Sequence, residues 1–318
     1  MKNLILTAGL LSCSLPLWAG EAIDSRMEAD GISKLTLVVP RGEVTLTGGS
    51  HSEIRVQGEL DDLAKEWVFE REGNTLVAEV KMPRNWRGDN EGSKLTVTLP
   101  GSIEVEASGV STHFSASDLS RGLELESVSG DLELARISGE VEADSVSGNI
   151  TASALEGEIE LETVSGDVKA QQIQGEASVE SVSGEVHLSR SGDRLAVENV
   201  SGDIKLQLDQ VGALEVTSVS GDIQVEVASL AANARLSFET VNGDTKLSLP
   251  QDASARFKLD TGPGGEISNR ISDHQPERGE YVPTESLSFS QGSSDARVEM
   301  KTVNGSLTLA PMAGGHLK

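Results

Sequence analysis

Acidic and hydroxyl side chains recur at a fixed spacing between residues 127 and 244. Near-copies of one pentapeptide occur there; the first five start 18 residues apart, and the last two intervals are 19 and 22. The copies are SVSGD 127–131, SVSGN 145–149, TVSGD 163–167, SVSGE 181–185, NVSGD 199–203, SVSGD 218–222 and TVNGD 240–244. Stacked repeats align equivalent residues in columns. A column of hydroxyls and amides is therefore expected, whose members bond backbone at a corner of each repeat or bond one another: Ser129, Ser147, Ser165, Ser183, Ser201, Ser220 and Asn242.

Carboxylates form two further columns, one before and one after each corner. The first comprises Glu126, Asp144, Glu162, Glu180, Glu198 and Glu239; the second comprises Asp131, Asp167, Glu185, Asp203, Asp222 and Asp244, with Asn149 interrupting it. Calcium between the rungs is one reading. Calcium-binding nonapeptides, however, carry several glycines and one apolar residue per nine, whereas each nine residues here carry one Gly and three apolar positions. The sequence therefore predicts a solvated acidic face, no metal site, and folding without calcium.

The sequence contains no motif that is typical of a catalytic site. The five histidines are scattered and have no metal-ligand spacing, and there is no nucleophile elbow or phosphate-binding loop. A polysaccharide-cleaving β-helix would need long inserted loops around positioned acids, for which residues 110–245 leave no room. We therefore predict no catalytic residues, no cofactor and no enzyme activity. A polysaccharide-acting enzyme stays open as the alternative.

One outward column is basic on an otherwise acidic protein. The middle residue of each Φ-x-Φ step, where Φ is apolar, should point to solvent. In three successive repeats this residue is Lys169, His187 and Lys205. These three side chains are the candidate surface binding strip, and a chance run of solvated residues is the competing explanation.

The elements that position these columns are short strands. Each 18-residue unit divides into two nine-residue halves in which apolar residues alternate and a glycine supplies a corner. A helix would need apolar residues at i, i+3, i+4 and i+7 and would not tolerate a glycine every nine residues. The sequence predicts an all-β, single-stranded β-solenoid, a right-handed β-helix with about 18 residues per coil.

The interior of the coils is expected to hold two kinds of apolar column. Leu132, Leu134, Ile137, Val141 and Ala143 should face inward in one coil. The corner valines should form a second buried column, made of Val128, Val146, Val164, Val182, Val200, Val219 and Val241. On this interpretation Val164→Asp would place an unpaired charge in the core.

The chain divides into an export signal and one domain. Residues 1–20 have the charge and apolar run of a secretory signal peptide. The predicted solenoid domain spans 21–310, with irregular coils and a cap at 31–109, regular repeats at 110–249 and C-terminal coils with a loop at 250–310; a disordered tail follows at 311–318. Export to the periplasm or cell surface follows. The alternative is a lipoprotein anchored through Cys13, in a lipobox-like sequence.

Charge limits the partners. The net charge of −25 excludes nucleic acid and disfavours direct binding to anionic lipid, because both need a basic surface. An envelope protein or a glycan remains as the partner class. We expect a monomer.

An exported start, a V-P-x-G step at 39–42, the repeated [ST]-V-[SN]-G-[DE] and a closing T-V-N-G at 302–305 occur together. This combination resembles the bacterial β-strand-repeat family labelled "putative adhesin", a domain of unknown function, over about residues 31–310. The resemblance implies an exported β-solenoid and supplies no site residues. The function expected is that of a non-catalytic cell-envelope binding or scaffold protein. A structural or stress-related periplasmic protein is a further alternative.

Overall fold

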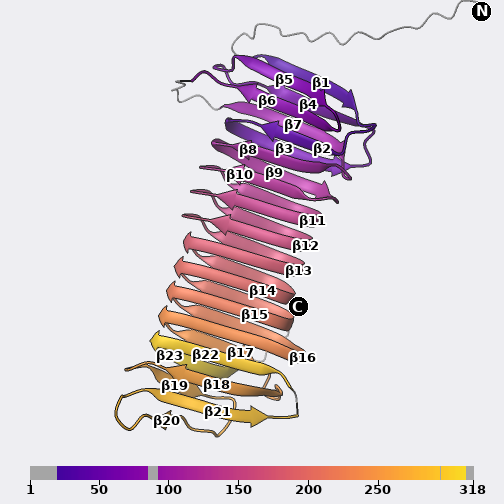
Figure 1. Ribbon diagram of the computed structural model, residues 1–318. Helices are drawn as coiled ribbons and strands as arrows, with labels where there is room; N and C mark the ends of the chain where they lie inside the picture. The colour runs from indigo at the N-terminus through magenta and orange to yellow at the C-terminus, as the bar shows by residue number, and fades with distance from the viewer. Residues whose placement is uncertain (1–19, 85–91, 294, 313–318) are drawn as a thin grey trace, which may run out of the picture.

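The computed structural model describes residues 20–84, 92–293 and 295–312. The described residues form one sheet of 23 strands and contain no helix, so none of them belongs to a helix that could cross a membrane. Figure 1 shows the strands stacked as successive coils of an elongated solenoid. The β-solenoid prediction is confirmed. Residues 1–19, which hold most of the predicted signal peptide and Cys13, lie outside the described residues.

Parallel pairing of equivalent residues builds the central coils. The strands are β10 (Leu123–Ser127), β11 (Leu132–Ser145), β12 (Ile150–Thr163), β13 (Val168–Ser183), β14 (Val186–Ser201), β15 (Ile204–Ser220) and β16 (Ile223–Asn242). Leu132 aligns with Ile150, and Ile150 aligns with Val168. One coil of the solenoid is therefore 18 residues long, the period of the sequence repeat. Where the period lengthens, β15 and β16 shift register between Val211 and Ala213, as the longer interval predicts.

Strands β11, β12 and β13 each bend between two straight segments, the arms of the coil. Arg136, Ala154 and Gln172 occupy this bend in successive coils with φ of 55°, 54° and 57°. This left-handed conformation is uncommon for residues other than glycine. The bend lets Leu132 and Leu134 of one arm and Val141 and Ala143 of the other all face the interior, where each is 2% exposed or less. The inward positions predicted for this coil are confirmed.

The corner valines, in contrast, are not in the core. Val128, Val146, Val164, Val182, Val200, Val219 and Val241 are 41–46% exposed, so the predicted buried column is wrong. Leu123, Leu125 and Ser127 point inward in strict alternation, and the next residue, Val128, must therefore point outward. The inward position at the corner is filled by the residue before each valine: Ser127, Ser145, Thr163, Ser181, Asn199, Ser218 and Thr240 are all buried.

We expect the same substitution at two valines four residues apart to change the free energy of unfolding by very different amounts. Val168→Ser removes a fully buried side chain and leaves a hydroxyl in an apolar interior, and should lower the free energy of unfolding by about 3 kcal/mol. Val164→Ser changes an exposed side chain and should alter it by less than about 0.5 kcal/mol. Urea denaturation followed by circular dichroism measures both. Equal losses would restore the buried-column interpretation.

The N-terminal end mixes parallel and antiparallel strands. These are β1 (Ala22–Glu28), β2 (Lys34–Val38), β3 (Arg41–Gly49), β4 (Glu53–Glu59), β5 (Glu66–Glu72), β6 (Thr75–Lys81), β7 (Ser93–Pro100), β8 (Glu104–Gly109) and β9 (Ser111–Leu119). Strands β2 and β3 join the coils in parallel through β8 and β9. The antiparallel order β1–β4–β7 and the β5–β6 hairpin then end the stack. Because these end strands run antiparallel, the N-terminal edge of the stack does not repeat the parallel pairing of the central coils. An edge of this kind is a poorer template for pairing with a further coil.

The C-terminal end is built by a return of the chain to the stack. The strands are β17 (Thr245–Leu249), β18 (Ala255–Thr261), β19 (Glu266–Asn269), β20 (Glu277–Arg278), β21 (Glu285–Gln291), β22 (Arg297–Asn304) and β23 (Ser306–Pro311). Strand β22 lies between β16 and β18, and β23 lies between β17 and β19. The T-V-N-G at 302–305 thus forms the next corner of the stack. Pro311, the first residue of the predicted tail, ends β23, and residues 313–318 lie outside the described residues.

Candidate functional site

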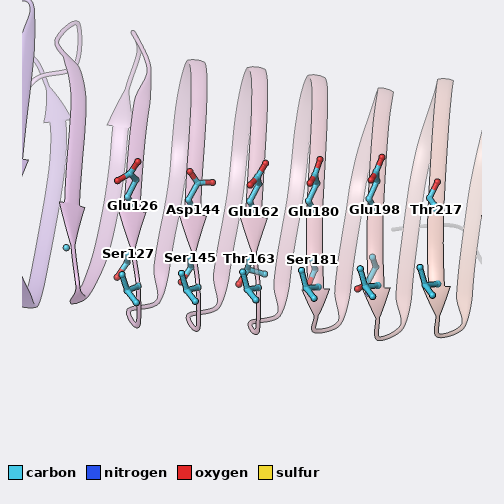
Figure 2. Close-up of a pocket in the computed structure, with 18 residues that line it drawn as sticks. Glu126, Ser127, Asp144, Ser145, Glu162, Thr163, Glu180, Ser181, Glu198 and Thr217 are labelled. Atoms are coloured by element: carbon cyan, nitrogen blue, oxygen red, sulfur yellow. The ribbon is translucent and has the colours of Figure 1, made fainter.

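A groove runs along the solenoid beside the corners of consecutive coils. Three columns line it, each contributed by one residue per coil (Figure 2). The carboxylate column consists of Glu126, Asp144, Glu162, Glu180 and Glu198; the inward column of Ser127, Ser145, Thr163, Ser181 and Asn199; and the valine column of Val128, Val146, Val164, Val182, Val200 and Val219. We call this surface the valine–carboxylate groove.

The inward column builds the corner beneath the groove. The Ser127 hydroxyl accepts a hydrogen bond from Gly130 N at 3.0 Å and donates to Thr112 O of the preceding coil, also at 3.0 Å. Thr163 makes the same pair of bonds, to Gly166 N and Gly148 O. The backbone bonding at the corner that was expected of Ser129 and its equivalents is thus made by residues two positions earlier, at Ser127, Ser145, Thr163 and Asn199. Among the described residues, the hydroxyls of Ser181, Ser218 and Thr240 have no hydrogen-bond partner. The backbone-bonding role was therefore assigned to the wrong column, although Asn242 of the predicted column accepts a hydrogen bond from the Asn304 amide at 3.0 Å.

The valine column is apolar surface that the fold does not bury. A large exposed apolar patch on a soluble protein marks an interaction surface more often than single scattered residues do. These valines recur in every coil from Val128 to Val241, and Val110 and Val303 add to the set with 45% and 49% exposure. The buried residue beside each valine already fills the inward position of the corner, so the exposed part of each valine adds nothing to the core.

The carboxylate column of the groove carries no counter-charge. Within the part of the chain that the structure describes, no ion pair or hydrogen bond joins Glu126, Glu180 or Glu198 to a basic group, and Asp144 Oδ1 is buried with no hydrogen-bond partner. Burial and the neighbouring carboxylates of Glu142, Glu126 and Glu160 raise the pKa of Asp144 to about 6. An acid whose pKa is raised in this way is held in its charged form at a cost.

The same effect is larger at Glu162. Burial, the charge of Asp144, a hydrogen bond shared with Glu160 and the charge of Glu180 raise the pKa of Glu162 to about 7. The groove therefore concentrates negative charge in a partly desolvated place. A cation entering it would relieve this repulsion and lower both pKa values.

These shifts predict how stability depends on pH. In the unfolded chain both carboxyls titrate near pH 4, so the folded state binds more protons between about pH 4 and pH 7 and stability falls as pH rises through this window. Glu162→Gln should flatten that fall and stabilise the protein at pH 8. Glu158→Gln, an exposed acid on the same face, is the matched control. Urea denaturation from pH 4 to pH 8 measures the effect, and an unchanged slope in Glu162→Gln would contradict it.

The second acidic column has a structural role in the stack. One carboxylate oxygen of several members accepts a hydrogen bond from the backbone nitrogen of the equivalent residue one coil further on: Asp131 from Asn149 at 2.8 Å, Asp167 from Glu185 at 3.0 Å, and Asp222 from Asp244 at 3.0 Å. Asn149 accepts from Asp167 N at 3.0 Å in the same way. The asparagine therefore interrupts the charge of the column and preserves its hydrogen bond. Among the described residues, no group of three or more His, Cys, Asp and Glu could hold a metal ion.

The basic strip predicted from sequence is assembled by the register. Lys169 aligns with His187, and His187 aligns with Lys205. Acids of the second column lie close to both lysines, with Lys169 Nζ 3.7 Å from Asp167 and Lys205 Nζ 3.3 Å from Glu185. The strip is thus contiguous, but its positive charge is opposed locally. Ligand binding there remains a prediction.

The fold and the groove define the class of the protein: an elongated β-solenoid with a repeated surface site. The family model described as Toastrack DUF4097 matches residues 32–310. The chain belongs to this family, and the resemblance to the "putative adhesin" family of unknown function is confirmed. No curated protein matches the chain.

Solved structures resemble the chain at low identity. A "putative lipid binding protein" from Parabacteroides distasonis is 14% identical with a TM-score of 0.45, covering 92% of this chain and 98% of that one. A "putative adhesin" from the same organism is 12% identical with a TM-score of 0.45 and the same coverage. A "putative adhesin" from Bacteroides fragilis is 14% identical with a TM-score of 0.36, covering 91% of this chain and 97% of that one.

Proposed function

We propose that this protein is a non-catalytic, exported cell-envelope binding protein and that the valine–carboxylate groove is its ligand surface. The observation that supports this most is the valine column, in which one side chain per coil is 41–46% exposed from Val128 to Val241. Each exposed valine leaves apolar area in water, which a partner would bury with a gain of about 25 cal/mol per Å². The signal peptide predicted at residues 1–20 supports a periplasmic or surface location.

The repeat region offers no enclosed place for catalysis. In the described part of 110–245 the coils follow one another through short corners, such as the four residues between Ser145 and Ile150. The groove is lined by equivalent positions of successive coils. Binding along a repeated surface suits this arrangement better than turnover of a single bond.

Capture from envelope extract tests the proposal. The purified protein, immobilised, is exposed to envelope extract and in parallel to a glycan array. The triple variant Val146→Ser, Val164→Ser, Val182→Ser removes apolar groove surface without touching the core. A matched variant, Lys169→Ser, His187→Ser, Lys205→Ser, removes the basic strip.

We expect the groove variant to lose the captured ligand and the strip variant to keep it. Retention by the groove variant with loss by the strip variant would move the site to the strip. Reproducible turnover of a polysaccharide by the purified protein would replace the binding assignment with an enzymatic one. Circular dichroism of each variant confirms that the β-fold is intact.

A further inference from the structure

The groove places unneutralised charge directly beside apolar surface. The second acidic column has backbone donors and nearby lysines, but among the described residues the groove carboxylates have no basic partner. Asp144 Oδ1, beside the groove, also lacks a hydrogen-bond partner in the described part of the chain. Both observations point to a missing partner that carries donors and positive charge.

Within the protein, a lysine already pairs with one carboxylate of this column. Further along the stack, the column passes through Thr217 to Glu239, which aligns with Lys301 of β22. The Lys301 ammonium donates to Glu239 Oε1 at 2.9 Å, beside Val241 and Val303, with which both residues line a continuation of the groove. A lysine side chain therefore fits the column when its ammonium meets a carboxylate and its neighbours are the exposed valines. The five carboxylates from Glu126 to Glu198 lack such a lysine within the described chain.

The spacing of the columns limits the shape of the ligand. At about 4.8 Å per coil, the five carboxylates span about 19 Å. An extended polypeptide repeats side chains on one edge about every 7 Å, so about three basic side chains would fit along the carboxylates while the opposite edge of the chain faced the valines. A second copy of this acidic chain, or an anionic lipid, would bring like charge to the groove.

We propose that the valine–carboxylate groove binds an extended polypeptide segment in which basic and apolar side chains alternate. The basic side chains lie along Glu126 to Glu198, and the apolar side chains cover the valine column. The inference rests on the proposed function and specifies its ligand class. Alternation of side chains on the two edges of an extended chain is the feature that matches two parallel columns of different chemistry.

Fluorescence anisotropy with labelled octapeptides tests the inference. The probe is (Lys-Val)₄ with blocked ends; (Lys-Ser)₄ keeps the charge and removes the apolar edge, and Lys₄Val₄ keeps the composition and removes the alternation. We expect (Lys-Val)₄ to bind the wild-type protein at least tenfold more tightly than either control peptide. We also expect its affinity to fall as salt rises, because the ion pairs are partly exposed.

Matched charge variants locate the site. Glu162→Gln with Glu180→Gln removes two groove carboxylates, and Glu140→Gln with Glu158→Gln removes two exposed acids of the same face that do not line the groove. The first pair should weaken (Lys-Val)₄ binding about tenfold and the second less than twofold. The triple Val→Ser variant should weaken it at least tenfold and should leave (Lys-Ser)₄ unaffected.

Each contrary outcome has a distinct meaning. Equal binding of (Lys-Val)₄ and (Lys-Ser)₄, or equal effects of the two charge variants, would show attraction by overall acidity and overturn the inference. If no peptide binds but the Val→Ser variant still loses its envelope ligand, the ligand class is wrong and the proposed function stands. If envelope capture is also unchanged in that variant, the proposed function fails as well.

Discussion

Gly166→Ala is expected to destabilise the solenoid by about 3 kcal/mol or more. Gly166 lies at a corner, and a Cβ added there would collide with the carbonyl of Gly148 in the coil below, with Gly148 C at 2.6 Å and Thr163 Oγ1 at 3.0 Å. The Gly148 carbonyl is a backbone group, so it cannot move out of the way by a side-chain rotation. Two coils would have to separate, and the hydrogen bonds between them would lengthen.

Gly73 is a control that separates the cost of a steric collision from the cost of an unfavourable backbone conformation. Gly166 has no left-handed φ, whereas Gly73 of the β5–β6 hairpin has a φ of +65° with open space around its Cβ position. Gly73→Ala should therefore cost only about 1 kcal/mol, the penalty for that conformation. Urea denaturation compares the two variants. Similar midpoints would mean that the corner glycines do not set the spacing of the coils.

Arg41→Met is expected to lower the free energy of unfolding by about 3–5 kcal/mol, because it leaves a buried carboxylate without its partner. Arg41 and Asp61 are 6% and 4% exposed. Arg41 forms a bidentate pair with Asp61, with Nη2 at 2.9 Å from Oδ1. Asp61 N donates to Ser93 Oγ at 3.0 Å, so the pair connects β3 and the end of β4 to the start of β7.

The pH dependence of this pair follows from its geometry. Burial alone would raise the pKa of Asp61, but the hydrogen bonds from Arg41 and Leu63 N and the Arg41 charge hold it below its usual value. A lowered folded-state pKa gives stability that is present above about pH 4 and is lost as pH falls further. This dependence is opposite in sign to that of the groove acids Asp144 and Glu162.

Two controls test the assignment to the buried pair. Arg26→Met breaks the exposed pair with Asp24, in which both side chains are about half exposed, and should change the unfolding midpoint little. The double variant Arg41→Met, Asp61→Leu removes both charges and should recover most of the loss. An unimpaired Arg41→Met single variant would show that the N-terminal coils do not depend on this pair.

The sequence by itself determined the coil. The 18-residue period, the alternation of Leu132 and Leu134, and a glycine at each corner leave parallel stacking as the arrangement that buries the apolar residues and pairs the backbone. These features are local and recur in every coil, so each coil independently indicates the same structure. The length of the coil and the inward residues of both arms could therefore be predicted.

Only the tertiary structure decided which way the corner residues face. The alternation Leu123, Leu125, Ser127 already placed the serine inward, but the preference of valine for interiors favoured Val128 over Ser127. The outcome depends on where the strand ends and the corner begins, because alternation holds only along a strand. Likewise, the two acidic columns look alike in the sequence. One accepts backbone hydrogen bonds from the next coil, whereas Glu126, Glu180 and Glu198 of the other have no basic partner among the described residues. This difference exists only once the coils are stacked, because stacking sets the distance from each carboxylate to a donor in the neighbouring coil.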